Sequence, residues 1–338
     1  MLHSLFWLLD HYPETGESVA SLHQAALEEA ALADHLGFAS LWISEHHFRS
    51  LSTVPNPAIL LAAMAQHTRT IRLGPATSVL PLHNPIHLAE DYALVDVLSN
   101  GRLNMGVGSG SQAMEFSPFN VDFELRREQF VKNLASFRQR WEIAARGEFG
   151  PDSLNVTPIQ SPAPPIYVAT MNRDAAYEIG RVGDSLLTLA SPSSANLEEV
   201  AARVQAHARG LEEAGKERGG VEAIVMMFAH ASQTDAEVEA VVVPALSRLM
   251  FNMAGTRLKD PKAFYEEMRK KGIGVFGTPT GVSHHLERLA DLGIGHVAFV
   301  SRFGGMSKEV ATRSLRLLAP GRSALRDPAE VLAASMGP

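Results

Sequence analysis

Residues 19–43, VASLHQAALEEAALADHLGFASLWI, decide the fold because they pass from a helical pattern to a buried strand. Apolar residues first recur at intervals of three and four, as on one face of a helix, and the pattern stops at Gly37. The short apolar run at 38–43 then has the character of a strand in a parallel sheet, and residues 5–9 form another such run. This stretch therefore predicts a strand-helix-strand unit.

The same alternation of short apolar runs and helical segments continues to the end of the chain. Repeated units of this kind are typical of α/β proteins with a parallel sheet. We expect a single (β/α)8 TIM-barrel domain over residues 1–338, with insertions after strands. A six-stranded doubly wound sheet with a helical appendage is the alternative. The expected strands cover residues 5–9, 38–43, 71–79, 102–107, 166–169, 185–189, 223–229 and 296–300.

Two segments are longer than a minimal unit requires. Residues 147–165 contain five prolines, and residues 231–278 contain extra helical patterns. Loops that follow barrel elements often shape active sites, so both segments are candidates for that role.

Composition narrows the function classes. Of the 338 residues, 46% are hydrophobic and 20% charged, which fits a protein with a sizeable core. A net charge of -7 argues against a nucleic-acid partner. No apolar stretch comes near the roughly 18 to 20 residues of a membrane span, and the N-terminus has no basic leader, so we expect neither membrane insertion nor export. The chain has no cysteine, which fits a reducing compartment, and we therefore expect it in the cytoplasm.

The motif Glu45-His46-His47-Phe48 follows the second expected strand, where barrel active sites are built. Imidazole is a suitable general base near neutral pH, and a neighbouring carboxylate can tune it. Ordinary capping and hydrogen bonding is an equally good interpretation. We expect no metal site, because two ligands at helical i, i+4 spacing are lacking. Other histidines are expected to be solvated or on helix surfaces: His83, His87, His284 and His285.

Two further segments are suited to a ligand. Residues 106–111, GVGSGS, would let a ligand approach the backbone, but they lack the third glycine of a dinucleotide fingerprint and also fit a flexible turn. Residues 171–174, MNRD, precede a helix whose first N–H groups suit a phosphate. Arg127 can provide a positive charge that binds the same phosphate. Alternatively, residues 171–174 are an ordinary helix cap and Arg127 is an ordinary surface charge.

Taken together, the chain resembles the luciferase-like flavin-dependent monooxygenases over nearly its whole length. The order and spacing of several segments carry the resemblance. These are residues 45–48 (EHHF), 79–85 (VLPLHNP), 89–91 (AED), 98–102 (LSNGR), 106–110 (GVGSG), 165–169 (PIYVA) and 276–279 (FGTP).

The resemblance implies a barrel that binds flavin mononucleotide (FMN) at the carboxyl ends of its strands. It places the family's catalytic histidine on His46 and a non-prolyl cis peptide beneath the flavin ring on Ala76-Thr77. Ser109 stands where luciferase has a phosphate-binding arginine, so we expect weaker flavin retention. Phosphate contacts are expected from the following residues: Ser109, Arg127, Met171 and Asn172.

The implied reaction uses reduced FMN, supplied by a separate flavin reductase, and O2. A C4a-hydroperoxyflavin then oxidises a small apolar organic substrate such as an aldehyde. His46 acts as the base or proton donor in this reaction, and Glu45 or His47 tunes the basicity of its imidazole. One alternative is a deazaflavin enzyme that transfers hydride, although such relatives usually have an Asp before a single His. Another is a non-catalytic flavin-binding barrel.

The resemblance also implies a homodimer. Family relatives pair through helices near the start of the barrel, and the helix from Pro57 is rich in small and apolar residues. Packing of the same residues into the barrel core is nearly as good an interpretation. The residues concerned are Ala58, Leu61, Ala62 and Ala65.

Overall fold

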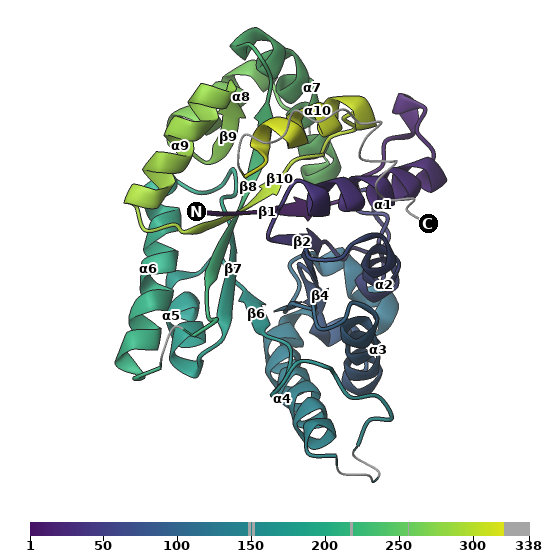
Figure 1. The fold of residues 1–338 in the computed structure, drawn as a ribbon. Helices are drawn as coiled ribbons and strands as arrows, with labels where there is room; N and C mark the ends of the chain where they lie inside the picture. The colour runs from purple at the N-terminus through teal and green to yellow at the C-terminus, as the bar shows by residue number, and fades with distance from the viewer. Residues whose placement is uncertain (148–149, 151–152, 217–218, 256, 321–338) are drawn as a thin grey trace.

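The computed structural model describes residues 1–147, 150, 153–216, 219–255 and 257–320, and shows a nearly closed barrel of parallel strands (Figure 1). The strand order is β3-β2-β1-β10-β8-β7-β6-β5-β4, and β9 pairs with β8. Since β3 and β4 belong to one chain segment, this order returns to its start, and the expected barrel is confirmed. The strands are β1 (Leu2–Trp7), β2 (Ser40–Ile43), β3 (Arg72–Pro75), β4 (Ser78–Val79), β5 (Met105–Gly108), β6 (Ile166–Ala169), β7 (Ser185–Leu189), β8 (Ala223–Ala231), β9 (Gly274–Gly277) and β10 (His296–Val300).

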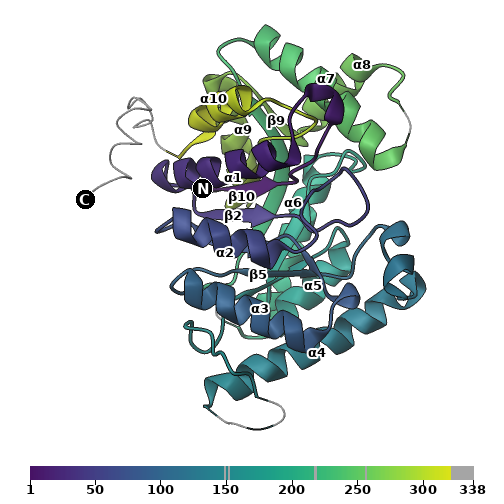
Figure 2. The same ribbon diagram turned by 90° about the vertical axis from the view of Figure 1, so that its right-hand side faces the viewer.

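Helices surround the strands, and Figure 2 shows α1, α2 and α3 side by side along one side of the barrel. Local sequence explains where they start: Asn56 and Asn84 each accept an N–H two residues on, ahead of a proline at the first helical position. The helices are α1 (Val19–His35), α2 (Pro57–His67), α3 (Pro85–Leu98), α4 (Arg126–Ala145), α5 (Arg173–Val182), α6 (Leu197–Glu213), α7 (Asp235–Ala254), α8 (Pro261–Lys271), α9 (Pro279–Asp291) and α10 (Lys308–Leu318), with short 3-10 turns η1 (Pro13–Thr15), η2 (Leu80–Leu82), η3 (Ala113–Glu115), η4 (Ser117–Phe119) and η5 (Phe123–Leu125).

One strand prediction needs correction, and one strand was missed. The strand expected over residues 71–79 is broken into β3 and β4, and the two residues between them, Ala76 and Thr77, are joined by a cis peptide bond. Strand β9 was not predicted at all. Its residues lie within the 231–278 segment, and they pair with the carboxyl half of β8, where Phe228 is opposite Gly274.

The two long segments lie at opposite ends of the barrel. The second one follows the carboxyl end of β8 and contains α7 and α8, as expected. The first precedes β6, and Gln160 in it binds Arg72 at the start of β3 and Asp96 near the end of α3. Residues 153–165 therefore support the amino ends of the strands, and the expectation that they shape the active site is wrong.

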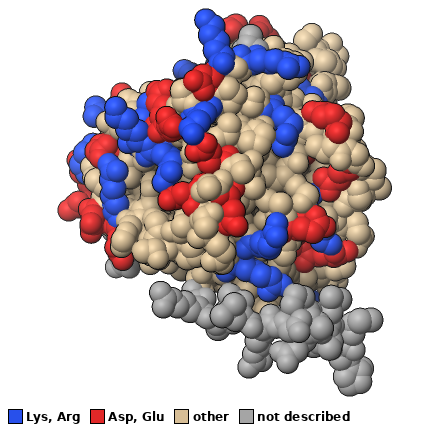
Figure 3. Space-filling model, turned by 90° about the horizontal axis from the view of Figure 1, so that it is seen from above, with Lys and Arg blue, Asp and Glu red and all other residues tan. Residues whose placement is uncertain are grey.

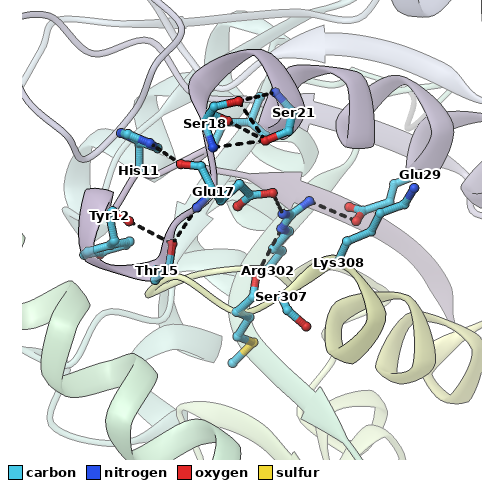
Figure 4. A network of polar contacts seen from close by, with 12 residues as sticks. His11, Tyr12, Thr15, Glu17, Ser18, Ser21, Glu29, Arg302, Ser307 and Lys308 are labelled. Carbon is cyan, nitrogen blue, oxygen red and sulfur yellow. Dashed lines mark hydrogen bonds and ion pairs between the residues drawn. The ribbon is translucent and has the colours of Figure 1, made fainter.

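A buried ion-pair network fixes the loop after β10 (Figure 4). The guanidinium of Arg302 donates to Glu29 at 3.0 Å and to Glu17 at 2.6 Å, and its Nε donates to the Met306 carbonyl at 3.3 Å. Because Glu17 and Glu29 lie just before and within α1, this network ties the two ends of the barrel sequence together.

The surface shows no separation of charge on the face in Figure 3, where acidic and basic side chains are interspersed. Among the described residues, no helix is long and apolar enough to cross a membrane.

Candidate active site

The residues that the sequence singled out lie at the carboxyl ends of neighbouring strands. If β3 and β4 are counted as one broken strand, the pairs β2-β3, β4-β5 and β5-β6 place four such ends in a row. His46 follows β2, Ala76 and Thr77 separate β3 from β4, Ser109 follows β5, Arg127 lies in the first turn of α4, and Met171 and Asn172 follow β6.

The break between β3 and β4 lies at this end of the barrel, because Pro75 at the end of β3 pairs with Ile43 at the end of β2. The peptide bond between Ala76 and Thr77 is cis, at the position that the family resemblance implied. Both residues are partly exposed, although the flanking Pro75 and Ser78 are buried. The Ala76 N–H donates to the carbonyl of Ile43 at 2.7 Å, so the break is anchored on β2 beside the histidine motif.

The glycines after β4 are required by packing within the chain. A Cβ at Gly106 would lie 2.0 Å from the Pro75 carbonyl oxygen, and one at Gly108 would lie 2.5 Å from Thr77 Oγ1. Both contacts are too short for any larger residue. These two glycines therefore let β5 lie against the break, which is a different reason from the close ligand approach that the sequence suggested.

His46 is hydrogen-bonded to a residue that sequence analysis missed. Its Nδ1 lies 2.9 Å from Oε1 of Glu115 in η3, and the two side chains are 19% and 3% exposed. The expectation that Glu45 or His47 tunes His46 is wrong, because both are engaged elsewhere. A single acidic residue in the apolar run 113–119, AMEFSPF, was the available signal, but only the fold shows what it contacts.

Glu45 forms a separate buried cluster with two other histidines. Its Oε1 lies 3.2 Å from His47 Nε2 and 2.7 Å from His83 Nε2. Its Oε2 accepts from the Ser78 hydroxyl and the Val79 N–H, both at 3.2 Å. His83 is thus part of the site, and the expectation that it is solvated is wrong.

Glu45 and His83 each favour the charged form of the other. Burial alone would raise the pKa of the Glu45 carboxyl, but hydrogen bonds from His47 and His83 and their charges outweigh burial and lower that pKa. Burial likewise opposes the charged form of His83, yet the hydrogen bond to Glu45 and its negative charge raise the pKa of His83 above its usual value. We interpret the cluster as a buried carboxylate paired with a histidinium.

Glu45, His47 and His83 also have the composition of a metal site, with ligand atoms within 4.8 Å of one another. However, the Glu45 carboxylate already receives four hydrogen bonds, which match the number of its lone pairs. A metal would have to displace several of them, so hydrogen bonding explains the cluster without one.

Donors suitable for an anion follow β5 and β6 in the chain, at the starts of α4 and α5. Arg127 is exposed and has no partner among the described residues, whereas Arg126 packs its guanidinium 3.7 Å from the Phe123 ring centroid. Asn172 caps α5 by accepting from Ala175, and its own N–H faces Thr170 Oγ1 at 3.1 Å. The open backbone donors are therefore those of the next two residues, which corrects the expectation for the backbone of Asn172.

Arg49 joins two loops and the end of α7 at this end of the barrel and was also missed. It donates to the Gln112 side chain at 2.5 Å and to the carbonyls of Asn252 and Met253 at 2.7 and 2.8 Å. The end of α7 is thereby fixed against the histidine loop and η3. The 231–278 segment contributes to this face, as predicted.

An apolar surface adjoins the histidines. Phe48 is 64% exposed and has a positive φ of 59°, and Phe119 is 38% exposed. Their ring centroids are 5.7 Å apart, and Phe119 meets the His47 ring edge-on at 4.8 Å. These side chains provide aromatic area next to the imidazoles.

Comparison with known proteins shows which family the chain resembles. Residues 3–296 match the model of a family described as luciferase-like monooxygenase. An uncharacterised protein of Sinorhizobium fredii is 28% identical over 327 residues, which cover 89% of this chain and 91% of that protein. The oxygenase component of a flavin-dependent trigonelline monooxygenase of Acinetobacter baylyi is 27% identical over 269 residues, which cover 78% and 73%.

Solved structures show the same fold. A monooxygenase of Streptomyces bottropensis has a TM-score of 0.85 at 23% identity, covering 94% of this chain and 98% of that one. The oxygenating constituent of 3,6-diketocamphane monooxygenase of Pseudomonas putida, solved with FMN, has a TM-score of 0.75 at 18% identity, covering 94% and 97%. An F420-dependent secondary alcohol dehydrogenase has a TM-score of 0.66 at 21% identity, covering 96% and 99%. From the family match over residues 3–296, the chain belongs to the luciferase-like monooxygenases, a family of oxidoreductases.

Proposed function

We propose that this enzyme uses reduced FMN and O2 to oxidise a small apolar organic substrate, and that a separate flavin reductase in the cytoplasm supplies the reduced flavin. One observation carries the proposal. The His46 imidazole is hydrogen-bonded to a buried carboxylate at the same barrel end as the Ala76-Thr77 break and the first turn of α5. A group that can move protons thus shares an end with donors suited to a flavin phosphate.

The donor set fits a flavin mononucleotide. Arg127 offers a full positive charge, and the first-turn N–H groups of Arg173 and Asp174 have no acceptor within α5. Ser109 is partly exposed and can add a hydroxyl, and Met171 is 52% exposed beside it in the row of strand ends. The partly exposed residues at the cis bond would contact the ring.

The chain's own residues would then control protons and water. Reduced flavin, when bound, supplies the electrons that activate oxygen. His46 would hold or move a proton at its Nε2 beside the reacting oxygen, because its Nδ1 is already engaged. Phe48 and Phe119 would cover the substrate with apolar area and exclude water.

Isotope incorporation tests this function. Purified protein is titrated with reduced FMN without oxygen, then mixed with 18O2 and a panel of n-alkanals and cyclic terpene hydrocarbons. We expect binding of reduced FMN and one 18O atom in the product of at least one panel member. Oxidation of an alcohol with reduction of F420 and no oxygen uptake would contradict the proposal, as would failure to bind reduced FMN.

We also propose a homodimer, through a different face from the one the sequence suggested. Ala58, Leu61 and Ala65 are buried within the chain itself, so they are barrel core. The exposed apolar residues on the neighbouring helices α2 and α3 include Ile59 at 73% and Leu94 at 49%. Light scattering should give twice the 36.6 kDa of one chain, and Ile59→Asp should reduce it. A wild-type monomer mass would contradict this assembly.

A further inference from the structure

Glu115 stands out among the buried acidic residues near the site. The residue is 2% exposed, and it lies in the short 3-10 turn η3, which follows the carboxyl end of β5. Among the described residues, its carboxylate has one hydrogen-bond partner, the Nδ1 of His46 at 2.9 Å, which comes from 69 positions earlier in the chain. Burial of a carboxylate costs free energy unless the group is hydrogen-bonded. The contact with His46 is therefore the interaction that accounts for Glu115 at this position.

The surrounding contacts hold the turn in place. Phe116, the next residue, is 1% exposed and packs edge-on against Phe123 with ring centroids 5.1 Å apart. Gln112, three residues earlier, accepts from Arg49, which lies in the same loop as His46. The carboxylate and the imidazole are therefore fixed relative to each other from both sides of the contact.

The neighbouring carboxylate does not compete for this role. Glu45 precedes His46 in sequence, but both of its oxygens are directed to His47, His83, Ser78 and Val79. A carboxylate accepts hydrogen bonds only, so Nδ1 of His46 must carry the hydrogen in its contact with Glu115.

We propose that Glu115 is the positioning residue for His46: it holds the neutral imidazole in the tautomer with its proton on Nδ1, which leaves the lone pair on Nε2 for the reaction. This inference rests on the proposed function for its catalytic consequence, but the tautomer itself does not. A carboxylate behind an imidazole also stabilises the positive charge that forms when Nε2 takes up a proton. Nε2 gains and later returns that proton, the Nδ1 proton stays in place, and Glu115 remains a carboxylate throughout.

The tautomer can be measured without substrate or flavin. Protein labelled with 15N in its histidine rings is studied by long-range 1H-15N correlation, and the His46 signals are assigned by their loss in His46→Ala. We expect Nδ1 to be the protonated nitrogen in wild type. In Glu115→Gln we expect a shift toward the Nε2-protonated form, because an amide can donate to Nδ1. Glu124→Gln, an exposed change in the same segment, should leave the His46 signals unchanged.

A double-mutant cycle tests the catalytic consequence. With reduced FMN, O2 and the best substrate of the isotope panel, Glu115→Gln should lower kcat by about tenfold or more, with KM and the reduced-FMN Kd changed by less than about threefold. Glu115→Asp should restore part of kcat. In the His46→Ala background, the further change Glu115→Gln should alter kcat by less than about twofold, because no imidazole remains to be positioned.

The outcomes separate the inference from the proposed function. A wild-type His46 protonated on Nε2, or one whose signals do not respond to Glu115→Gln, would overturn the positioning role whatever the reaction is. An equal loss of kcat from Glu115→Gln with and without His46 would show a structural role for Glu115 only. Full activity of His46→Ala with the expected tautomer in wild type would instead contradict the proton-transfer role given to His46 in the proposed function and leave the dyad intact.

Discussion

His46 and His47 are neighbours in sequence, yet the fold gives them different carboxylate partners and different surroundings. His46 is partly exposed and paired with Glu115 from a distant turn. His47 is 8% exposed and belongs to the cluster of Glu45 and His83, where charges are buried and mutually satisfied. We infer that the first pair is arranged for proton transfer and the second for stability.

The same contrast recurs between Arg126 and Arg127. The first stacks over Phe123 and donates to its carbonyl at 2.8 Å, whereas the second is exposed without a described partner. Adjacent residues on a helix face different directions, so chemical identity is a poor guide to role. What distinguishes each member of both pairs is whether its polar group is already satisfied by the protein.

The largest expected difference between the two histidine pairs is in stability. Glu45→Gln removes the only carboxylate of the buried cluster and leaves His47, His83, Ser78 and Val79 to share one amide oxygen as acceptor, which should cost about 1 to 3 kcal/mol of unfolding free energy. Glu115→Gln should cost only about 0.5 to 1.5 kcal/mol, the value of one hydrogen bond with a partly exposed partner. Urea unfolding of both variants measures this, and equal losses would remove the distinction between a structural cluster and a catalytic pair.

The arginine pair should differ in flavin affinity. Arg127→Ala should weaken binding of FMN by about 1.5 to 3 kcal/mol, or roughly 10- to 150-fold in Kd, the range for a charge-assisted hydrogen bond. Arg126→Ala is the matched control and should change Kd by less than about twofold, because its guanidinium is engaged with Phe123. If the control weakens binding as much as Arg127→Ala, the phosphate contact has been assigned to the wrong arginine.

The smallest expected effect is a pH dependence of the buried cluster. The pKa of Glu45 is lowered, so its contribution to stability is present above pH 4.5 and is lost as pH falls through the folded-state value. The pKa of His83 is raised, so its contribution is fully present below pH 6.5 and is lost as pH rises through the folded-state value. The cluster should thus stabilise most between about pH 4.5 and 6.5.

The variant His83→Gln isolates this effect. Between about pH 6 and 9, wild type should lose more unfolding free energy than the variant, because only wild type has the raised His83 pKa. Parallel pH profiles for the two proteins would show that His83 is not charged in the native state.

Local signals in the sequence account for what could be predicted. Asn-Pro pairs marked the starts of α2 and α3, and the strand ends placed His46, Ser109 and Asn172 on one face. Strand β9 was missed because its four residues lie inside a segment with helical patterns, and it is defined by pairing with β8. Whether Arg127 and Asn172 bind phosphate stays a prediction.

Tertiary contacts explain what was missed in the site. No pattern in the sequence connects Glu115 to His46 across 69 residues, or His83 to Glu45 across 38. The glycines at 106 and 108 were visible, but the sequence does not show that Pro75 and Thr77 are what they approach. Polar contacts between loops that are distant in sequence form only when the barrel is folded. The spacing of residues within one segment therefore does not predict them.

Turnover of His46→Ala beside His47→Ala tests the central claim most directly. At saturating reduced FMN and substrate, we predict that His46→Ala lowers product formation by about two orders of magnitude or more and raises peroxide release, with FMN Kd changed only a few-fold. His47→Ala, measured where circular dichroism shows it folded, should lose far less turnover because His46 and Glu115 remain. Wild-type turnover in His46→Ala, or an equal loss in both variants, would contradict the assignment of proton transfer to His46.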